Sequence, residues 1–197
     1  MNILRKSSSG TQVVPMDASF LSDRKIFILG EIDADSACAF AKSVMLLAAE
    51  DAAAPIDVYV NSPGGEINAG LLMYDVIQSS RTPIRLFCLG KAYSMGAILF
   101  LSGRHGRYML PHAELMLHEP LVGAIGSRSA GSVQELSDSL QSSKKMMVGI
   151  IAKHSGMSEE AVDREFSRDR YLNAEESVAF GFCDKIMSFD EMTGGAA

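Results

Sequence analysis

One serine in this chain stands where a nucleophile could be activated. Ser94 lies in the segment Gly90–Ala97, between a predicted strand and a predicted apolar helix. At the start of a helix, the dipole and the unpaired amides stabilise developing negative charge. Small neighbours such as Ala92 and Gly96 permit the strained turn that exposes a nucleophile. An ordinary serine N-cap produces the same pattern and is commoner, so position alone does not select Ser94.

The histidines narrow the choice of a base for a catalytic serine, because the chain has only four. His118 ends the apolar run Leu115–Leu117, and the Glu119-Pro120 pair that follows it stops a strand. A lone histidine at the end of a buried strand is usually structural, but here it could reach a cleft beside the serine helix and act as a general base. A third, orienting carboxylate would complete the set, and Asp169 and Asp163 are the late candidates. The remaining histidines lie in predicted turns or near a predicted solvated helix end: His105, His112 and His154.

A glycine-rich segment, Asn61–Gly65, follows directly on a predicted strand that ends at Val60. Paired glycines let a backbone turn sharply and leave bare N–H groups that can face a ligand. A simple tight turn explains the same residues. Phosphate binding is disfavoured, because neither of the glycine-rich phosphate motifs, GxGxxG or GxxxxGKS/T, occurs here.

The order of the candidate residues along the chain separates them from one familiar hydrolase class. An α/β-hydrolase carries GxSxG, and its catalytic residues follow in the order serine, acid, histidine. This chain reads AYSMG around Ser94, and its best order is Ser94, His118, Asp169. The residues therefore predict nucleophilic catalysis on a different fold.

The elements that would position these residues follow from hydrophobic periodicity. Short apolar runs stopped by glycine or proline predict strands, and apolar residues at helical spacing predict helices. We expect strands over residues 24–30, 56–60, 84–89, 107–110, 113–118 and 183–187, and helices over residues 36–50, 67–78, 95–101, 132–154 and 174–180. This alternation predicts an α/β fold with a mostly parallel sheet covered by helices. The helix over 132–154 is long for a small domain and could project as an arm.

Composition narrows the classes of function. The chain has 197 residues, enough for one good-sized domain, and a net charge of −6 with no basic block, which disfavours nucleic-acid binding. No apolar run approaches the roughly 18 residues that span a bilayer, and the N-terminus lacks the apolar region of a secretory signal. The cysteines are odd in number, far apart and without CxxC spacing, which disfavours disulfides and zinc and favours a reducing cytoplasm. They are Cys38, Cys88 and Cys183.

Four segments together resemble one family, the proteolytic subunit of Clp protease, ClpP. They read YVNSPGG at 59–65, AYSMGA at 92–97, MLHEPL at 116–121 and RDRYLNAEE at 168–176, and the resemblance covers roughly residues 24–188. It implies a crotonase-like α/β fold, built of repeated β-β-α units with a projecting handle helix, and serine endopeptidase activity. It also implies heptameric rings stacked as a tetradecamer, and ATP-dependent hydrolysis of unfolded proteins with an AAA+ unfoldase such as ClpX, ClpA or ClpC.

The same resemblance implies roles for individual residues. Ser94 would be the nucleophile, His118 the general base and Asp169 the group that orients the imidazole. The amides of Gly65 and Met95 would form the oxyanion hole. The residues that would bind an extended peptide are Gly64, Leu121, Val122, Gly123, Ala124, Ile125 and Gly126. The resemblance implies no metal and no cofactor in this chain, since ATP is used by the partner unfoldase.

The resemblance also predicts limits within the chain: an N-terminal arm or axial segment over 1–22, the peptidase domain over 23–190 and a flexible tail over 191–197. Some residues expected at the docking and ring-contact regions depart from the family, such as Ser79 after Gln78 and Ser167 before Arg168. These departures indicate a divergent or second ClpP paralogue, which could work in a mixed barrel.

Three alternatives to an autonomous, unfoldase-dependent protease remain open. The chain could be a weakly active or structural subunit of a mixed barrel, or a maturation protease that needs no unfoldase. A crotonase-type acyl-CoA enzyme is the third alternative, and it is disfavoured because such an enzyme has no need of a serine, histidine and aspartate set.

Overall fold

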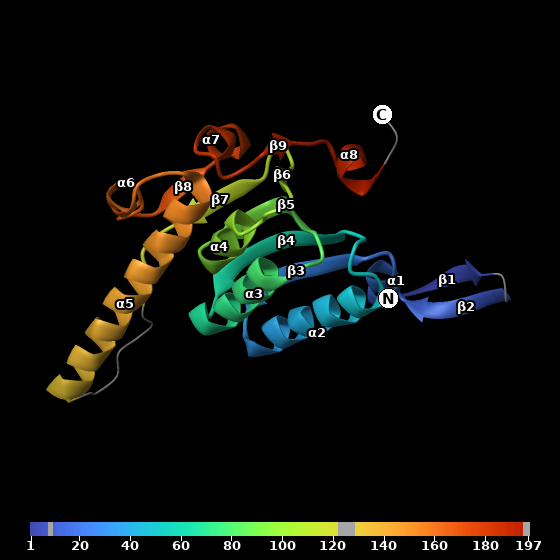
Figure 1. The fold of residues 1–197 in the computed structure, drawn as a ribbon, viewed down its shortest axis with the longest axis horizontal. Coiled ribbons are helices and arrows are strands. Elements are labelled where there is room, and N and C mark those ends of the chain that lie inside the picture. Colours follow the sequence, from blue (N-terminus) through green and yellow to red (C-terminus); the bar gives the residue numbers. More distant parts are fainter. Residues whose placement is uncertain (8–9, 122–128, 195–197) are drawn as a thin grey trace.

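The computed structural model describes residues 1–7, 10–121 and 129–194 (Figure 1). Its strands are β1 (Asn2–Ser7), β2 (Gly10–Pro15), β3 (Lys25–Ile32), β4 (Ile56–Gly65), β5 (Ile84–Tyr93), β6 (Arg107–Met109), β7 (Glu114–Leu117), β8 (Arg170–Leu172) and β9 (Lys185–Ile186). Its helices are α1 (Met16–Ser22), α2 (Ala34–Glu50), α3 (Ile67–Ser79), α4 (Met95–Leu101), α5 (Ala130–Ser155), α6 (Glu159–Glu165), α7 (Ala174–Ala179) and α8 (Phe189–Thr193).

A seven-stranded sheet forms the centre of the molecule, with the path β3-β4-β5-β6-β9 and with β7 and β8 branching from β5. The pairs along this path and the pair β5–β7 are parallel, whereas β7 and β8 are antiparallel. Parallel strands need crossover connections, and α2 and α3 supply them between β3, β4 and β5. The mostly parallel α/β sheet predicted from periodicity is therefore confirmed.

One apolar core joins the sheet to the helices α2, α3 and α4. Phe40 of α2 and Met73 of α3 belong to the same buried cluster as Val58 of β4 and Leu86 of β5. Every residue of α4 is buried, which explains why its sequence is apolar all round instead of amphipathic. Its bounds are those predicted from the sequence.

The other face of the sheet carries a row of aromatic side chains. Four of them are register partners on successive strands: Phe27, Tyr59, Phe87 and Tyr108. Neighbouring rings in this row have centroids 5.0 Å apart, close to the spacing of strands in a sheet, about 4.8 Å. Met192 of α8 packs on this row, and Tyr59 Oη donates a hydrogen bond to its carbonyl at 3.2 Å.

The sheet forks along β5, and this fork brings distant parts of the chain together. The first half of β5 pairs with β6, at Leu86–Cys88, and its second half pairs with β7, at Lys91–Tyr93. β7 then pairs with the short strand β8, which comes much later in the chain. The ends of β5, β7 and β8 therefore lie next to one another.

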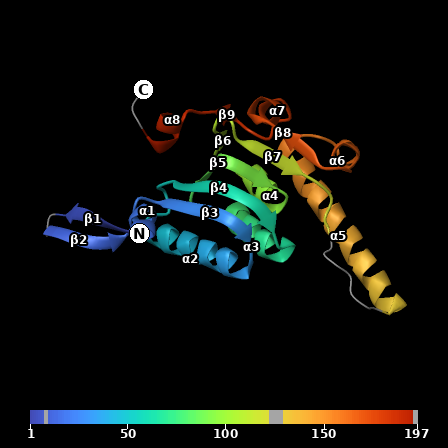
Figure 2. The same ribbon diagram turned by 180° about the vertical axis from the view of Figure 1, so that it is seen from behind.

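The helix α5 projects beyond the sheet, as its predicted length suggested (Figures 1 and 2). It has 26 residues, and only its second half enters the core, through Met147, Ile150 and Ile151. None of the residues from Gly131 to Met146 is buried. In the part of the chain that the structure describes, no helix combines the length and the apolar character needed to cross a membrane.

Several elements were not predicted from the sequence: β1, β2, α1, α6, β8 and α8. They are short or mostly exposed, so they carry little apolar periodicity. The predicted N-terminal arm thus holds an antiparallel pair, β1–β2, followed by α1. Arg5 ties the pair to α1 through the carbonyl of Ser19, at 3.3 Å. The axial role of residues 1–22 stays a prediction, as do the other limits of the domain.

Candidate active site

The three candidate residues of the predicted catalytic set each adjoin the end of one strand. Ser94 directly follows β5, His118 directly follows β7, and Asp169 directly precedes β8. β7 lies between the other two strands, parallel to β5 and antiparallel to β8. The three residues therefore meet at one edge of the forked sheet, although 75 positions separate the first from the last in sequence.

Ser94 and His118 form the closest contact of the site, since His118 Nε2 lies 2.8 Å from Ser94 Oγ. This distance is within the range expected of a nucleophile and its general base, about 2.6–3.2 Å. His118 is mostly buried, with 14% of its side chain exposed. The prediction that the histidine at the end of its strand reaches the serine helix is confirmed.

The backbone of Ser94 is strained. Its φ is 53° and its ψ is −121°, and among the described residues only Arg24 shares a positive φ without being glycine. Such conformations cost about 1–3 kcal/mol and persist only where the surroundings hold them. Here the Ser94 amide donates to the carbonyl of Met116 at 2.7 Å, so that the turn between β5 and α4 is fixed by β7.

Asp169 is the carboxylate that the fold brings to His118. Its Oδ1 lies 3.6 Å from His118 Nδ1, which is longer than a hydrogen bond, and the Nδ1 atom has no hydrogen-bond partner among the described residues. Asp163, the other candidate, forms an ion pair with Lys144 at 2.7 Å instead. Asp169 is 61% exposed, so this side of the set is open to solvent.

The glycine-rich segment is part of a strand, which corrects the prediction of a turn. β4 continues through it to Gly65, and Gly64 and Gly65 pair with Glu31 and Ile32 of β3. From Leu29 to Glu31, β3 advances two residues while β4 advances three, from Asn61 to Gly64, so the extra residue forms a bulge. The apolar alternation that marks the strand stops at the bulge, which explains why its end was predicted too early.

Both glycines of this segment are required by close approaches. Gly64 has a φ of +95°, and a Cβ there would lie 2.6 Å from the Tyr93 carbonyl and 2.8 Å from the Ser94 Cβ. Gly65 has a φ of +155°, and a Cβ there would lie 2.0 Å from the carbonyl oxygen of Ile32. The segment therefore runs directly against the serine turn. Met95 begins α4, where first-turn amides have no partner within the helix.

Two side chains that sequence reasoning did not single out hold this segment in place. Ser62 is fully buried, donates to the carbonyl of Gly30 at 2.6 Å, and accepts from the Gly64 amide at 3.0 Å. Asn61 accepts a hydrogen bond from the Lys91 amide at 3.1 Å. The sequence signal was available, because short polar side chains beside paired glycines bind local backbone groups. Since the Gly64 amide is engaged, the next amide along the chain, that of Gly65, is the better candidate for a ligand.

A narrow apolar pocket opens beside Ser94 and His118. Its volume is about 30 Å³. The other residues that line it are Ile67, Met95, Ile98, Leu117, Pro120, Met147 and Ile151. A pocket of this composition favours an apolar group next to Ser94.

The remaining predicted residues fall outside this geometry. Leu121 is exposed, and the predicted substrate-binding residues Val122, Gly123, Ala124, Ile125 and Gly126 lie outside the described residues. His154 is half-buried instead of solvated, with Tyr74 Oη 3.1 Å from its Nε2 atom, and burial lowers its pKa to about 4. Within residues 1–7, 10–121 and 129–194, no cluster of three or more His, Cys, Asp or Glu side chains could hold a metal ion.

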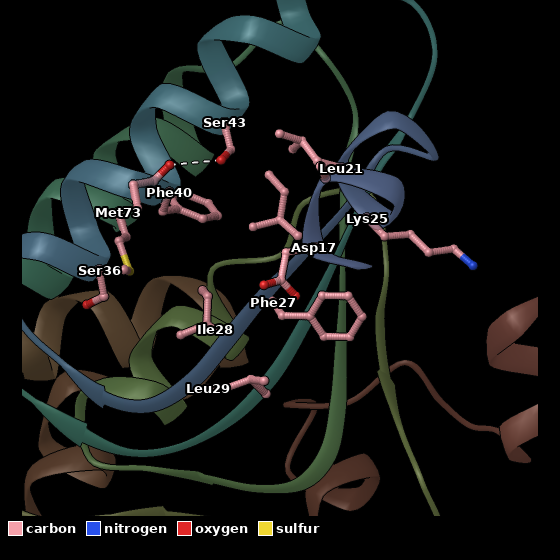
Figure 3. Close-up of a pocket in the computed structure, with 13 residues that line it drawn as sticks. Asp17, Leu21, Lys25, Phe27, Ile28, Leu29, Ser36, Phe40, Ser43 and Met73 are labelled. Atoms are coloured by element: carbon pink, nitrogen blue, oxygen red, sulfur yellow. Dashed lines mark hydrogen bonds between the residues drawn. The ribbon is translucent and has the colours of Figure 1, made fainter. Parts of the chain in front are cut away.

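A wider hollow, of about 490 Å³, lies between α1, β3 and α2 (Figure 3). Phe27 and Leu29 of β3 and Phe40 of α2 line it, and Asp17 of α1 points toward it (Figure 3). None of the predicted catalytic residues lines this hollow. The catalytic candidates and the wider hollow are therefore separate features.

A comparison with protein families supplies an independent result. The family model described as Clp protease matches residues 8–190, which is nearly the whole chain. The match includes Ser94, His118, Asp169 and the glycine-rich segment.

Proposed function

The chain belongs to the Clp protease family, and on that premise we propose that it is a serine endopeptidase whose nucleophile is Ser94. The family is that of the ClpP-type peptidases, with the crotonase-like α/β fold. The contact between His118 Nε2 and Ser94 Oγ, at 2.8 Å on a strained turn, carries the proposal. A mostly buried histidine this close to a serine at a helix start has the geometry of a nucleophile and its base.

In the proposed reaction, Ser94 Oγ attacks the carbonyl carbon of the scissile peptide bond while its proton passes to His118 Nε2. Asp169 stabilises the imidazolium that results. Collapse of the tetrahedral intermediate breaks the C–N bond, and the leaving amine takes the proton from His118. A water molecule, deprotonated by the same histidine, then attacks the ester on Ser94, and the acid product leaves with the enzyme restored.

The amides of Gly65 and Met95 are the proposed donors to the oxyanion. Met95 is the first residue of α4, and Gly65 ends the strand that runs against the serine turn. Donors fixed in advance cost no reorganisation during the reaction, and removing one costs about 2.7–4 kcal/mol in comparable hydrolases. The backbone contacts that fix both positions support the proposal that these donors are preformed.

We propose that the substrate is an extended polypeptide that adds as a strand beside the end of β4. Backbone recognition of this kind suits unfolded proteins of varied sequence. The apolar pocket beside Ser94, with a volume of about 30 Å³, would hold only a small apolar group of the substrate. No metal or cofactor in this chain has a step in the reaction.

Members of this family are generally ring-forming oligomers that work with AAA+ unfoldases. By that relation we propose heptameric rings stacked as a tetradecamer, with ATP used by an unfoldase such as ClpX, ClpA or ClpC. The part of α5 over residues 131–146, none of which is buried, supports a contact between rings, because it exposes Val133 and Met146. A reducing compartment such as the cytoplasm suits the free thiols of Cys38, Cys88 and Cys183.

Labelling with a fluorophosphonate tests the nucleophile directly. We expect the probe to modify Ser94 in the wild-type chain, and Ser94→Ala to abolish both labelling and hydrolysis of a fluorogenic peptide. Ser43→Ala is the matched control, because among the described residues the Ser43 hydroxyl bonds only the Ala39 carbonyl of its own helix. Labelling that persists in Ser94→Ala would exclude this serine as the nucleophile.

A second function is favoured by one observation, the 3.6 Å gap between His118 Nδ1 and Asp169. A subunit whose acid is not engaged would be weakly active alone and would gain activity in a mixed barrel. Native mass spectrometry and peptide hydrolysis, with and without a paralogue, separate the two functions. Full turnover by the chain alone would exclude the weakly active subunit.

A further inference from the structure

The strands that carry the catalytic candidates are joined on the face opposite the apolar core. On the inner face, Ala92, Leu115 and Leu172 are register partners, and all three are fully buried. Side chains alternate along a strand, so the residues one position away point to the other face. Tyr93 and Tyr171 lie there, on either side of Met116, which is their common register partner.

Tyr93 contacts both neighbouring strands on that face. Its hydroxyl donates a hydrogen bond to Oε1 of Glu114, on β7, at 2.5 Å. Its ring meets the ring of Tyr171, on β8, edge to face, with centroids 5.7 Å apart and an angle of 87° between the planes. Lys91 adds a cation over the Tyr93 ring, at 5.7 Å from the centroid. Tyr93 thus joins β5, β7 and β8, and it is the residue directly before Ser94.

The strand β8 depends on such contacts more than the other two strands do. It has three residues and pairs only with β7 among the described strands. Leu172 anchors it in the core. Arg170 adds a partly exposed ion pair with Glu165 at 3.4 Å and lies over the Phe180 ring, 5.9 Å from its centroid. Exposed ion pairs contribute little, about 0–1 kcal/mol. The ring of Tyr93 is therefore a principal support for β8 on its outer face.

The position of Asp169 follows from the position of β8, because Asp169 directly precedes this strand. Its carboxylate is 61% exposed and lies 3.6 Å from His118 Nδ1. A shift of β8 by a fraction of an ångström would bring this contact within hydrogen-bond distance or remove it. Tyr171 is two residues from Asp169 in the chain. Its contact with Tyr93 therefore acts on the distance between Asp169 and His118.

We propose that Tyr93 is a positioning residue, which sets the distance between Asp169 and His118 through Glu114 and Tyr171. This role rests on the proposed function of Ser94, His118 and Asp169. The Tyr93 side chain lies on the face of the sheet opposite the apolar core, and it takes no part in the bond changes. Its hydrogen bond to Glu114 raises the pKa of its phenol to about 12, so the hydroxyl stays a donor wherever the peptidase would work.

The test is a set of variants assayed for kcat and KM on one fluorogenic peptide. We expect Tyr93→Ala to lower kcat about tenfold, since small misplacements of catalytic groups cost up to about 10²-fold. KM should stay within about twofold, because no substrate contact is removed. Tyr93→Phe keeps the ring contact and should retain more than half of the wild-type kcat. Tyr171→Ala, at a half-exposed position, should reproduce the loss if Tyr93→Ala fails to fold.

A double-mutant cycle separates positioning from general destabilisation. In an Asp169→Asn background, Tyr93→Ala should cause no further loss of kcat, because its effect passes through Asp169. Phe189→Ala, which removes an exposed ring on α8, is the control and should leave kcat unchanged.

Two results would overturn the role of Tyr93 while leaving the proposed function intact. In the first, the fold loss of kcat in the double variant equals the product of the fold losses in Tyr93→Ala and Asp169→Asn. In the second, kcat is unchanged in both Tyr93→Ala and Tyr171→Ala while Ser94 is still labelled. A wild-type chain that the fluorophosphonate does not label at Ser94 would instead overturn the proposed function, and the role of Tyr93 with it.

Discussion

The site has a serine side and an acid side, and His118 lies between them. On the serine side, β5 is a central strand, α4 is buried throughout, and the Ser94 amide is held by the carbonyl of Met116. The glycine-rich end of β4 presses against the same turn, with Gly64 close to the Ser94 Cβ. Many independent contacts therefore fix the proposed nucleophile, and they hold a backbone conformation that would otherwise relax.

The acid side is held by fewer contacts and is less buried. β8 has three residues and Asp169 is 61% exposed. Its carboxylate stands 3.6 Å from His118 Nδ1, whereas Ser94 Oγ stands 2.8 Å from Nε2. The difference indicates that the proposed nucleophile and base are preformed, while the proposed acid is the adjustable member. Regions with few buried contacts open at low cost in free energy, so the acid side is where assembly or a partner would act.

The largest effect is expected on the serine side, from Ser94→Ala and His118→Ala. Each should lower kcat by about 10⁴-fold or more, because the two residues act as one unit. Peptide hydrolysis measures the loss, and native mass spectrometry checks that the proposed oligomer is retained. If both variants dissociate the proposed oligomer, then the two residues are structural, and the serine side is not a preformed catalytic pair.

The glycine-rich segment tests whether the serine side is as rigid as its contacts indicate. Gly65→Ala should lower kcat by about 10²–10³-fold, since a Cβ there would meet the Ile32 carbonyl at 2.0 Å and displace a proposed oxyanion donor. The thermal midpoint should fall as well. Gly156→Ala is the control, because Gly156 also has a positive φ, +74°, but open space around it. That control should lower stability by about 1–2 kcal/mol and leave kcat unchanged.

The acid side should respond more weakly. Asp169→Asn should lower kcat by about 10–10²-fold, less than the loss at Ser94, because the carboxylate is exposed and only loosely engaged. Asp163→Asn is the matched change at the other candidate acid and should leave kcat nearly unchanged. A silent Asp169→Asn together with a severe Asp163→Asn would show that the acid was misassigned.

The same contrast explains which parts of the fold and of the site could be predicted from the sequence. The central strands and α4 are continuous apolar runs, so periodicity located them, and the types of Ser94 and His118 pointed to their pairing. β8 and α6 carry no such pattern, because they are short and take their shape from neighbours on other elements. The bulge at Asn61–Gly65 was mistaken for a turn, since only the pairing with β3 shows that the strand continues. Parts fixed by local pattern were predictable, and parts fixed by tertiary contacts were not.

The smallest effect is expected from an ion bridge next to His118, in which Lys144 pairs with both Glu119 and Asp163. Lys144 of α5 lies 2.7 Å from Glu119, the residue after His118, and 2.7 Å from Asp163 of α6. Hydrogen bonds to Asp163 and Glu119 raise the pKa of Lys144 above its usual 10.5. The bridge therefore contributes fully to stability at neutral pH, and its contribution is lost as the pH rises through that raised pKa.

Lys144→Met should lower the free energy of unfolding by about 1 kcal/mol or less, because the bridge is partly exposed. It should lower kcat a few-fold at low salt, since Glu119 then holds the backbone beside His118 less firmly, and the loss should shrink in about 1 M salt. Lys145→Met is the matched control, because Lys145 is exposed and forms no ion pair within the described residues. An effect of Lys144→Met as large as that of Asp169→Asn would mean that α5, and not β8, sets the position of the base. The adjustable part of the site would then lie on the projecting helix.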